Sequence, residues 1–160
     1  EVCGYGFTAD ANHITAPLED GAMGARAMSL AIESAKISPD KIDYVNTHGT
    51  STPVGDIAEI KAIKKALGED HAKKIKVNST KSMTGHTLGA AGVSEAIFSL
   101  LMMQNDFIAP SINVDELDEQ AKGFDIVANK AREAKLETVM SNSFGFGGTN
   151  ASLVLHKYHG

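Results

Sequence analysis

The sequence has one cysteine, no tryptophan and only four prolines in 160 residues. A single cysteine, Cys3, excludes an internal disulfide bond and is typical of proteins from a reducing compartment. No secretory signal is visible, and no apolar run reaches the roughly 20 residues that a membrane-spanning helix needs. These absences predict a cytoplasmic protein with no membrane partner.

Clusters of basic residues are absent as well. The 15 lysine and arginine residues are outnumbered by 20 aspartate and glutamate residues, which gives a net charge of −5. Aromatic residues make up 6% of the chain and do not alternate with basic ones. Because nucleic-acid-binding surfaces are usually basic, often with aromatic residues between the charges, we expect no nucleic-acid partner.

The remaining composition is typical of a globular protein. Hydrophobic residues make up 42% of the chain and charged residues 22%. The length suits one domain or half of a larger one. Strand-like runs alternate with helical patterns, which predicts an α/β unit of about five strands with helices between most of them. Glu1 is no initiator methionine and stands at a strand-like run, so we expect the chain to be cut from a longer polypeptide.

The first strand-like run contains GYGFTA (residues 4–9), which matches a dinucleotide-binding fingerprint superficially. That fingerprint needs a helix to begin at its glycines, whereas residues 10–17 form a polar loop. We therefore expect no nucleotide site.

The other expected elements are helices at 21–35, 53–67 and from 93, strands at 42–45, 75–78, 138–140 and 151–156, a charged surface loop at 69–74 and a covering loop at 108–123.

The strand at 42–45 leads into NTHGTSTPVGD (residues 46–56). His48 follows the carboxyl end of that strand, which is where open α/β sheets place their ligands. Thr50 and Thr52 have the spacing that puts two hydroxyls on one side of an extended segment, able to hold the amides of a linear ligand. Alternatively, both threonines cap the helix, for which Thr52 is the expected N-cap.

The second motif is STKSMTGHTLGAAG (residues 79–92). His86 stands just before the helix from Val93, where the positive end of the helix dipole disfavours a charged imidazole. A neutral histidine can donate an N–H to a developing oxyanion or enolate. The alternative is a structural histidine that caps a turn.

The helix that begins at Val93 is apolar on nearly every side, so we expect it to be buried in the core on all sides. Glu95 is its one ionisable residue. A buried carboxylate needs a proton or a cation, and Lys81 is the nearest cation in the sequence. Alternatively, Glu95 lies at an exposed edge of the helix without a role.

The third motif is NSFGFGGTN (residues 142–150), a glycine-rich turn between two strands. It is not a phosphate loop, because a strand follows it where a helix is needed. Phe146, between two glycines, could swing aside to open a pocket, and its N–H could complete an oxyanion hole. The alternative is a hydrophobic turn packed on the core.

Together, these three motifs closely resemble the β-ketoacyl-acyl carrier protein synthases, the elongating condensing enzymes of fatty-acid synthesis. The resemblance covers essentially the whole chain. The segments at 107–120 and 138–155 look most like synthase I. The resemblance implies the thiolase-like fold, in which two similar halves, each with a five-stranded mixed sheet flanked by helices, stack in alternating layers. This chain, over residues 1–160, resembles the C-terminal half.

The resemblance also implies roles for residues of the three motifs. His48 and His86 correspond to the catalytic histidines that donate N–H bonds to the malonyl thioester oxygen, and Lys81 supports the site. Thr50 and Thr52 correspond to the pair that binds the phosphopantetheine arm. Phe146 corresponds to the gate that joins the oxyanion hole, with Phe144 beside it.

Four further residues correspond to the place where some family members hold a structural cation: Glu95, Asn46, Ser141 and Asn142. No other cofactor is implied, since the phosphopantetheine arrives on the acyl carrier protein. The implied partners are the acyl and malonyl forms of that carrier and a second copy of the complete enzyme in a homodimer.

The nucleophilic cysteine of the family belongs to the N-terminal half, and Cys3 cannot replace it. We therefore expect this chain alone to be inactive. One alternative is a polyketide ketosynthase, although those usually have HGTGT where this chain has Ser51 in the fourth position. Another is a non-catalytic subunit resembling a chain-length factor, which has no need of His48, His86 and Lys81. A third idea, a metal site of His48, His86 and Glu95, is weak because these spacings match neither a helical nor a zinc-finger ligand pattern.

Overall fold

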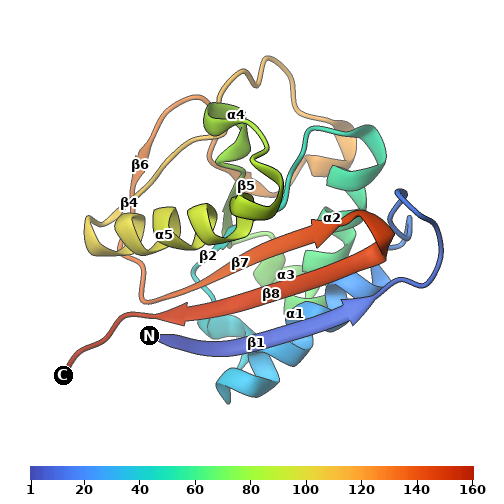
Figure 1. The fold of residues 1–160 in the computed structure, drawn as a ribbon. Helices are drawn as coiled ribbons and strands as arrows, with labels where there is room; N and C mark the ends of the chain where they lie inside the picture. Colours follow the sequence, from blue (N-terminus) through green and yellow to red (C-terminus); the bar gives the residue numbers. More distant parts are fainter.

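A six-stranded mixed sheet forms the centre of the structure, a computed structural model that describes all of residues 1–160 (Figure 1). The spatial order of its strands is β1-β8-β7-β2-β3-β5. The strands are β1 (Val2–Ala9), β2 (Tyr44–Asn46), β3 (Lys76–Asn78), β5 (Asp125–Ile126), β7 (Thr138–Gly145) and β8 (Thr149–His156), and β4 (Phe107–Ile108) pairs with β6 (Arg132–Glu133) in a separate ribbon.

The sheet has one strand more than the five expected. The additional strand, β5, is a two-residue edge strand parallel to β3. Two residues are too few to show the alternation of apolar and polar side chains by which a strand is predicted. The α/β class and the mixed sheet are confirmed.

Strand directions bring three chain segments to one edge of the sheet. β2 runs parallel to both β3 and β7, while β7 and β8, and β8 and β1, are antiparallel. The carboxyl ends of β2, β3 and β7 therefore lie at the same edge. Each of the three sequence motifs begins there.

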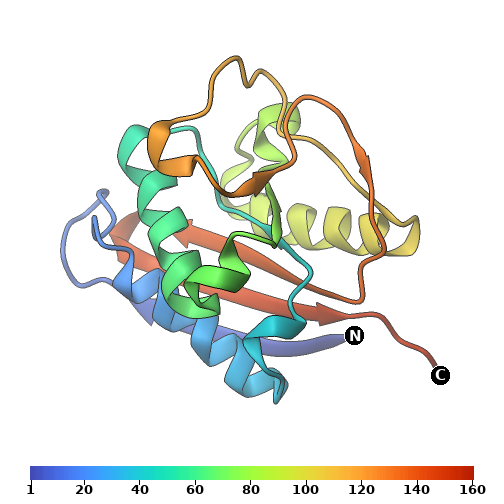
Figure 2. The same cartoon turned by 180° about the vertical axis from the view of Figure 1, so that it is seen from behind.

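Helices cover both faces of the sheet. They are α1 (Ala22–Ala35), α2 (Pro53–Leu67), α3 (Glu69–Ala72), α4 (Lys81–Thr84) and α5 (Ala91–Gln104). α1 and α2 lie on the face seen in Figure 2, and α5 lies on the opposite face, over β7, as Figure 1 shows. Residues 69–72 form the short helix α3 where a surface loop was expected; that expectation was wrong, because the chain starts a new helical turn directly after Gly68.

Close packing of α1 on β1 explains the two glycines of GYGFTA. A Cβ atom on Gly6 would lie 1.9 Å from the Ala27 carbonyl oxygen, and one on Gly4 would lie 2.1 Å from the Ala31 carbonyl oxygen. β1 continues through both glycines to Ala9, and no helix begins there. The glycines serve the contact between helix and sheet.

The hydrophobic core has two parts, one on each side of the sheet. The larger lies under α1 and α2 and includes Met28, Ile63 and Met140. The smaller lies under α5 and includes Tyr44 and Met102. None of the helices combines the length and apolarity that a membrane crossing requires.

The expectation that α5 is buried on all sides was wrong. Its inner face, with Glu95 and Met102, packs on the sheet, but Val93 is 67% exposed and Ile97 is 51% exposed on the outer face. The chain supplies only one surface for this helix to pack against, so uniform apolarity does not produce uniform burial. The sheet is also bare of helices beside α5, over β8 and β1 (Figure 1), where Phe7 is exposed.

Candidate active site

A cavity of about 1030 Å³ lies at the edge of the sheet where β2 and β7 end. It is large enough for an extended organic ligand. Several residues of all three sequence motifs line it: His48, Thr50, Thr52, His86, Phe144 and Phe146.

The two motif histidines meet in the wall of this cavity. His48 lies two residues beyond the end of β2, and His86 lies in the segment between α4 and α5, beyond β3. Their ring centroids are 5.3 Å apart, and the ring planes are inclined by 82°. The structure thus brings together two imidazoles that are 38 positions apart in the sequence.

His48 is held in the neutral form. Burial of its ring, followed by the positive charge of Lys81 and the neighbouring His86, lowers its pKa to about 3. Its Nδ1 atom is buried and has no hydrogen-bond partner. A neutral imidazole at this position can donate one N–H without first losing a proton.

His86 is exposed in this chain and is oriented by its own loop. Its Nδ1 accepts a hydrogen bond from the Leu88 N–H at 3.2 Å, so the ring proton is on Nε2. A short turn over residues 88–90 separates His86 from α5, which begins at Ala91. The backbone group that orients the ring is therefore the N–H of Leu88 in this turn.

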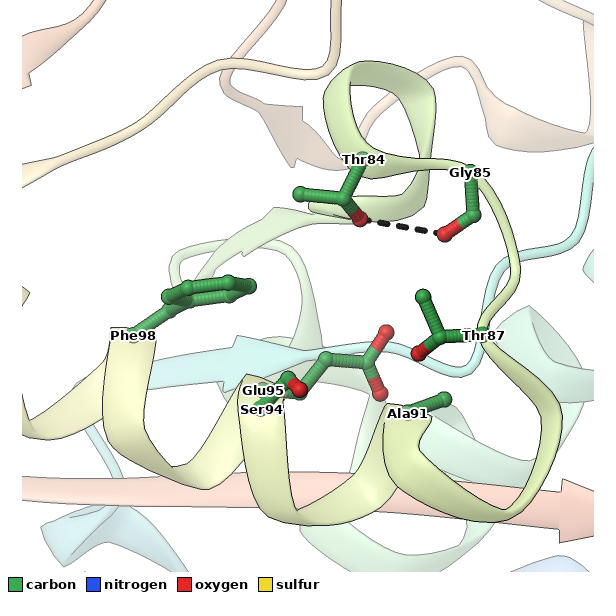
Figure 3. A pocket seen from close by; sticks show the side chains of 7 residues that line it. All are labelled: Thr84, Gly85, Thr87, Ala91, Ser94, Glu95 and Phe98. Carbon is green, nitrogen blue, oxygen red and sulfur yellow. Dashed lines mark hydrogen bonds between the residues drawn. The ribbon is translucent and has the colours of Figure 1, made fainter.

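Lys81 and Glu95 form a buried ion pair, as the sequence predicted. Lys81 Nζ lies 2.5 Å from Glu95 Oε1, and the two side chains are 5% and 2% exposed. Burial raises the pKa of Glu95, and the bond from Lys81 offsets part of this rise. A cavity of about 60 Å³ lies beside Glu95, between α5 and the Thr84–Gly85 turn (Figure 3).

Thr50 and Thr52 lie together at the cavity wall. Their hydroxyl oxygens are 3.3 Å apart. Thr52 is the N-cap residue of α2, as expected, but its hydroxyl caps no backbone N–H. Instead, the Asp56 carboxylate accepts the Thr52 N–H at 3.3 Å. The two hydroxyls are thus available to a ligand in the cavity.

Phe146 stands at the cavity rim and is 79% exposed. The turn that carries it is tied to the loop after β1, since the Gly147 N–H donates to the Ile14 carbonyl at 2.7 Å. Asp10, from the same loop, accepts a hydrogen bond from the Asn150 amide at 2.6 Å. The ring of Phe144 lies deeper, 6.1 Å from the ring of His48.

The four residues that correspond to the cation position of some family members lie on two different faces of the sheet. Asn46 pairs with Ser141 on the neighbouring strand. Asn46 Oδ1, the Asn46 amide nitrogen and Glu95 Oε2 are buried without partners, and the two oxygens are of the type that binds a hard cation. Asn142 points to the other face, where it donates to Glu59 at 3.1 Å. No three His, Cys, Asp or Glu side chains lie together in a group that could hold a metal ion, and His48, His86 and Glu95 form no such group.

Glu59 is a residue of this site that was not predicted from the sequence. This carboxylate on α2 is 4% exposed and accepts the N–H groups of His48 and Gly49. A signal was present in the sequence, because Glu59 belongs to the helical stripe that is otherwise formed by Ala58, Ala62 and Ile63.

A family model described as the C-terminal domain of β-ketoacyl synthases matches residues 1–115. The chain belongs to this family.

Curated proteins of known name support the same β-ketoacyl synthase assignment. The chain is 54% identical over 160 residues to 3-oxoacyl-[acyl-carrier-protein] synthase 1 of Haemophilus influenzae, covering 100% of this chain and 37% of that protein. It is 51% identical over 157 residues to synthase 2 of Vibrio harveyi, covering 98% of this chain and 38% of that protein. The chain thus spans under two fifths of the length of these relatives.

Solved structures show the same thiolase-like arrangement. A β-ketoacyl synthase from Burkholderia phymatum superposes with a TM-score of 0.91 at 40% identity, over 99% of this chain and 37% of that one. A ketosynthase in complex with its type II polyketide acyl carrier protein gives a TM-score of 0.94 at 34% identity, over 99% of this chain and 38% of that one.

Proposed function

We propose that this chain supplies the His48, His86 and Lys81 part of the active site of a 3-oxoacyl-[acyl-carrier-protein] synthase. Such an enzyme elongates a fatty acyl chain by decarboxylative Claisen condensation with a malonyl thioester. The observation that carries this proposal is the pair of imidazoles, 5.3 Å apart in the wall of a large cavity, one of them held neutral by burial.

Decarboxylation of the malonyl group requires hydrogen-bond donors at one oxygen. When the bond between the α-carbon and the carboxylate breaks, its electron pair moves into the thioester, and negative charge develops on the thioester oxygen. Donors that are already in place stabilise this charge without reorganisation. His48 and His86 can donate to the same oxygen because their rings are neighbours.

Lys81 acts on this site by its charge. It is the second largest cause of the lowered pKa of His48, after burial, and so helps to keep that imidazole neutral. Its own charge is balanced by Glu95, which limits the cost of burying an ammonium group.

Formation of the carbon–carbon bond needs an acylated cysteine that this chain lacks. The α-carbanion attacks an acyl thioester, and the cysteine thiolate that carried the acyl group leaves. Cys3 cannot supply that thiolate, because it lies near the start of β1, at the end of the sheet opposite the cavity. We therefore place the nucleophile in a second half of the enzyme.

The uncovered apolar surface supports assembly with that half. On α5, Val93, Ile97 and Leu101 are exposed, and on β1, Tyr5 and Phe7 are exposed. An apolar surface of this kind on a soluble protein is typical of an interface. In the layered arrangement that the family resemblance implies, the partner half packs here.

Fatty-acid elongation is favoured over polyketide synthesis by sequence similarity. The 3-oxoacyl-[acyl-carrier-protein] synthases reach 51–54% identity with this chain, whereas the polyketide ketosynthase with its carrier has 34%. Retention of both histidines and Lys81 speaks against a non-catalytic chain-length factor. Both the synthase 1 and the synthase 2 groups are represented among the relatives, and the likeness to synthase I stays a prediction.

An acyl carrier protein is the partner that this function requires. The neighbour that was solved with its carrier supports this partner. Thr50 and Thr52 would hold the amides of the phosphopantetheine arm at the cavity wall. The homodimer and the cytoplasmic location stay predictions.

The test separates the two half-reactions in the complete enzyme. Carbon dioxide release from malonyl carrier protein and acyl transfer to the cysteine are measured for His48→Ala, His86→Ala and the control His159→Ala, an exposed histidine near the C-terminus. We expect the first two variants to lose decarboxylation by roughly 10²- to 10³-fold, with acyl transfer largely kept. Undiminished decarboxylation in both variants would refute the proposal.

A further inference from the structure

Ser51 has a left-handed backbone conformation between the two threonines of the cavity wall. Its φ is +61°, in the region that residues other than glycine, asparagine and aspartate rarely adopt. Ser51 is exposed and does not line the cavity, whereas Thr50 and Thr52 do. Backbone strain of this kind collects where a ligand is held. Here it stands at a residue whose own side chain forms no part of the cavity wall.

The left-handed residue brings the two threonine hydroxyls together. Along an extended strand, residues two positions apart are separated by roughly 6.6 Å, because each residue advances the chain by about 3.3 Å. The hydroxyl oxygens of Thr50 and Thr52 are 3.3 Å apart, which is within hydrogen-bond distance. An extended segment was expected here, but the chain bends at Ser51. The bend accounts for the short distance between the hydroxyls.

The chain is fixed on both sides of this bend. The Gly49 carbonyl accepts a hydrogen bond from the Ser79 hydroxyl at 2.7 Å. Thr52 is the N-cap residue of α2, and its hydroxyl lies against Gly55, where a Cβ atom would come within 2.4 Å of the oxygen. Because both ends are fixed, the conformation of Ser51 decides whether the two hydroxyls meet.

Two hydroxyls at this distance match the polar groups of an amide. One hydroxyl donates to the other, which leaves one O–H donor and free lone pairs for a ligand. A secondary amide offers one N–H donor and one C=O acceptor, so it can bond to both members of the pair at once. The pair faces the cavity of about 1030 Å³, where an extended ligand can place such an amide.

We propose that Ser51 is a positioning residue for the thioester substrate, whose left-handed backbone holds the Thr50 and Thr52 hydroxyls in place for an amide of the substrate's arm. The inference rests on the proposed function, because it concerns the arm that delivers the malonyl group to the same cavity. Ser51 acts through its backbone, so its hydroxyl is dispensable. The role belongs to substrate binding and leaves the decarboxylation step itself unchanged.

The experiment compares four variants of the complete enzyme, all without the hydroxyl: Ser51→Gly, Ser51→Asn, Ser51→Ala and Ser51→Val. Glycine adopts the left-handed conformation freely, asparagine adopts it more readily than alanine, and β-branched valine resists it most. The KM for malonyl carrier protein should stay within about twofold of the wild type with glycine or asparagine and rise about tenfold with valine. Alanine should fall between. The kcat of decarboxylation should change less than about threefold in all four.

The order of the four variants separates backbone conformation from side-chain size. Asparagine is larger than alanine, so an effect of bulk would give Ser51→Asn the higher KM of the two, whereas the positioning role gives it the lower. A matched control is Lys36→Val, because Lys36 has a φ of +56° at the end of α1 and does not line the cavity. This variant should unfold at a lower urea concentration but keep its KM within about twofold.

A second comparison tests whether Ser51 acts through the threonines. In a background of Thr50→Ala and Thr52→Ala, Ser51→Val should raise KM no further, because no hydroxyls remain to be placed. A further tenfold rise in that background would show that Ser51 acts by another route and would overturn the inference.

An unchanged KM in Ser51→Val, a KM order that follows side-chain size, or an equal rise in Lys36→Val would also overturn it. If Ser51→Val does not fold, the other three variants decide, and a KM for Ser51→Ala at or below that of Ser51→Asn counts against the role. If His48→Ala keeps its decarboxylation, the proposed function itself has failed. If His48→Ala loses it and the Ser51 series does not change KM, only the role of Ser51 has failed.

Discussion

The rings of His48 and His86 lie nearly perpendicular at a centroid distance of 5.3 Å, and the positive charge of Lys81 acts on His48. At such a distance, two protonated imidazoles would repel each other strongly. Because burial and Lys81 lower the pKa of His48 and keep its ring uncharged, no such repulsion arises.

The first prediction concerns the titration of His48. Burial and Lys81 lower its pKa to about 3, so the ring should stay uncharged throughout the pH range in which an exposed histidine titrates. In NMR spectra of the folded protein, the Cε1–H chemical shift of His48 should stay flat from pH 8 to pH 5. A titration midpoint between pH 6 and pH 7 would contradict the assigned environment.

The second prediction concerns the stability that the protein loses when the buried Glu59 carboxyl group ionises. Its pKa is raised from 4.5 to about 7, so the folded protein binds the proton more tightly than the unfolded chain. The contribution of Glu59 to stability is thus complete below about pH 4.5 and is lost as the pH rises through 7. The loss amounts to about 3 kcal/mol.

Urea unfolding of the wild type and Glu59→Gln at several pH values measures this cost. The difference between their free energies of unfolding should shift by about 3 kcal/mol against the wild type between pH 4.5 and pH 8. Use of the difference cancels the opposite contribution of His48, whose lowered pKa makes the folded state more stable as the pH rises from about 3 to 6.5. A difference that does not change with pH would disprove the raised pKa.

The third prediction concerns the ion pair of Lys81 and Glu95. Lys81→Met leaves a buried carboxylate unpaired, and Glu95→Leu leaves a buried ammonium group unpaired, so each should cost about 3–5 kcal/mol of unfolding free energy. The double variant removes both charges and should lose far less than the sum of the two. Denaturant unfolding of all four proteins completes the cycle. Additive losses would mean that the two groups do not interact.

The fourth prediction concerns the outer face of α5. The chain of 160 residues, studied alone, should self-associate as its concentration rises, because Val93, Ile97 and Leu101 are exposed. Ile97→Glu should reduce this association in sedimentation experiments, while Lys122→Glu, at a distant charged surface, should not. In the complete enzyme, Ile97→Glu should instead weaken the contact between the halves and lower the melting temperature. A stable complete enzyme with Glu at this position would argue against an interface on α5.

The three motifs were recognisable in the sequence because each gathers glycines with histidine, hydroxyl or aromatic residues next to a predicted strand. His48 and His86 each follow a short apolar run and are surrounded by small residues, and alternation of strands and helices predicts that such ends meet at one edge. The ion pair of Lys81 and Glu95 was predictable from the absence of any other cation near that helix. These inferences depend on local pattern and on the cost of unpaired charge.

Glu59 and the outer face of α5 were not predicted, for two different reasons. Glu59 stands in a helix with several lysines, where a glutamate is normally solvated, and two of its three partners are backbone N–H groups, which leave no mark on the sequence. The apolarity of α5 indicates burial, but it does not tell which surface covers the helix. Val93 and Ile97 are left exposed by the rest of these 160 residues.

The parallel pairing of β2 with β3 has a consequence for how this site can change over time. Neighbouring strands lie about 4.8 Å apart, and the two imidazole centroids, at 5.3 Å, nearly repeat that spacing. The pairing of the strands brings their carboxyl ends to one edge, but α4 separates β3 from His86, so the lengths of the two connecting segments also set the gap between the rings. Helices and loops elsewhere can change in sequence without altering that gap, whereas an insertion between Asn78 and His86 would move one ring away from the other.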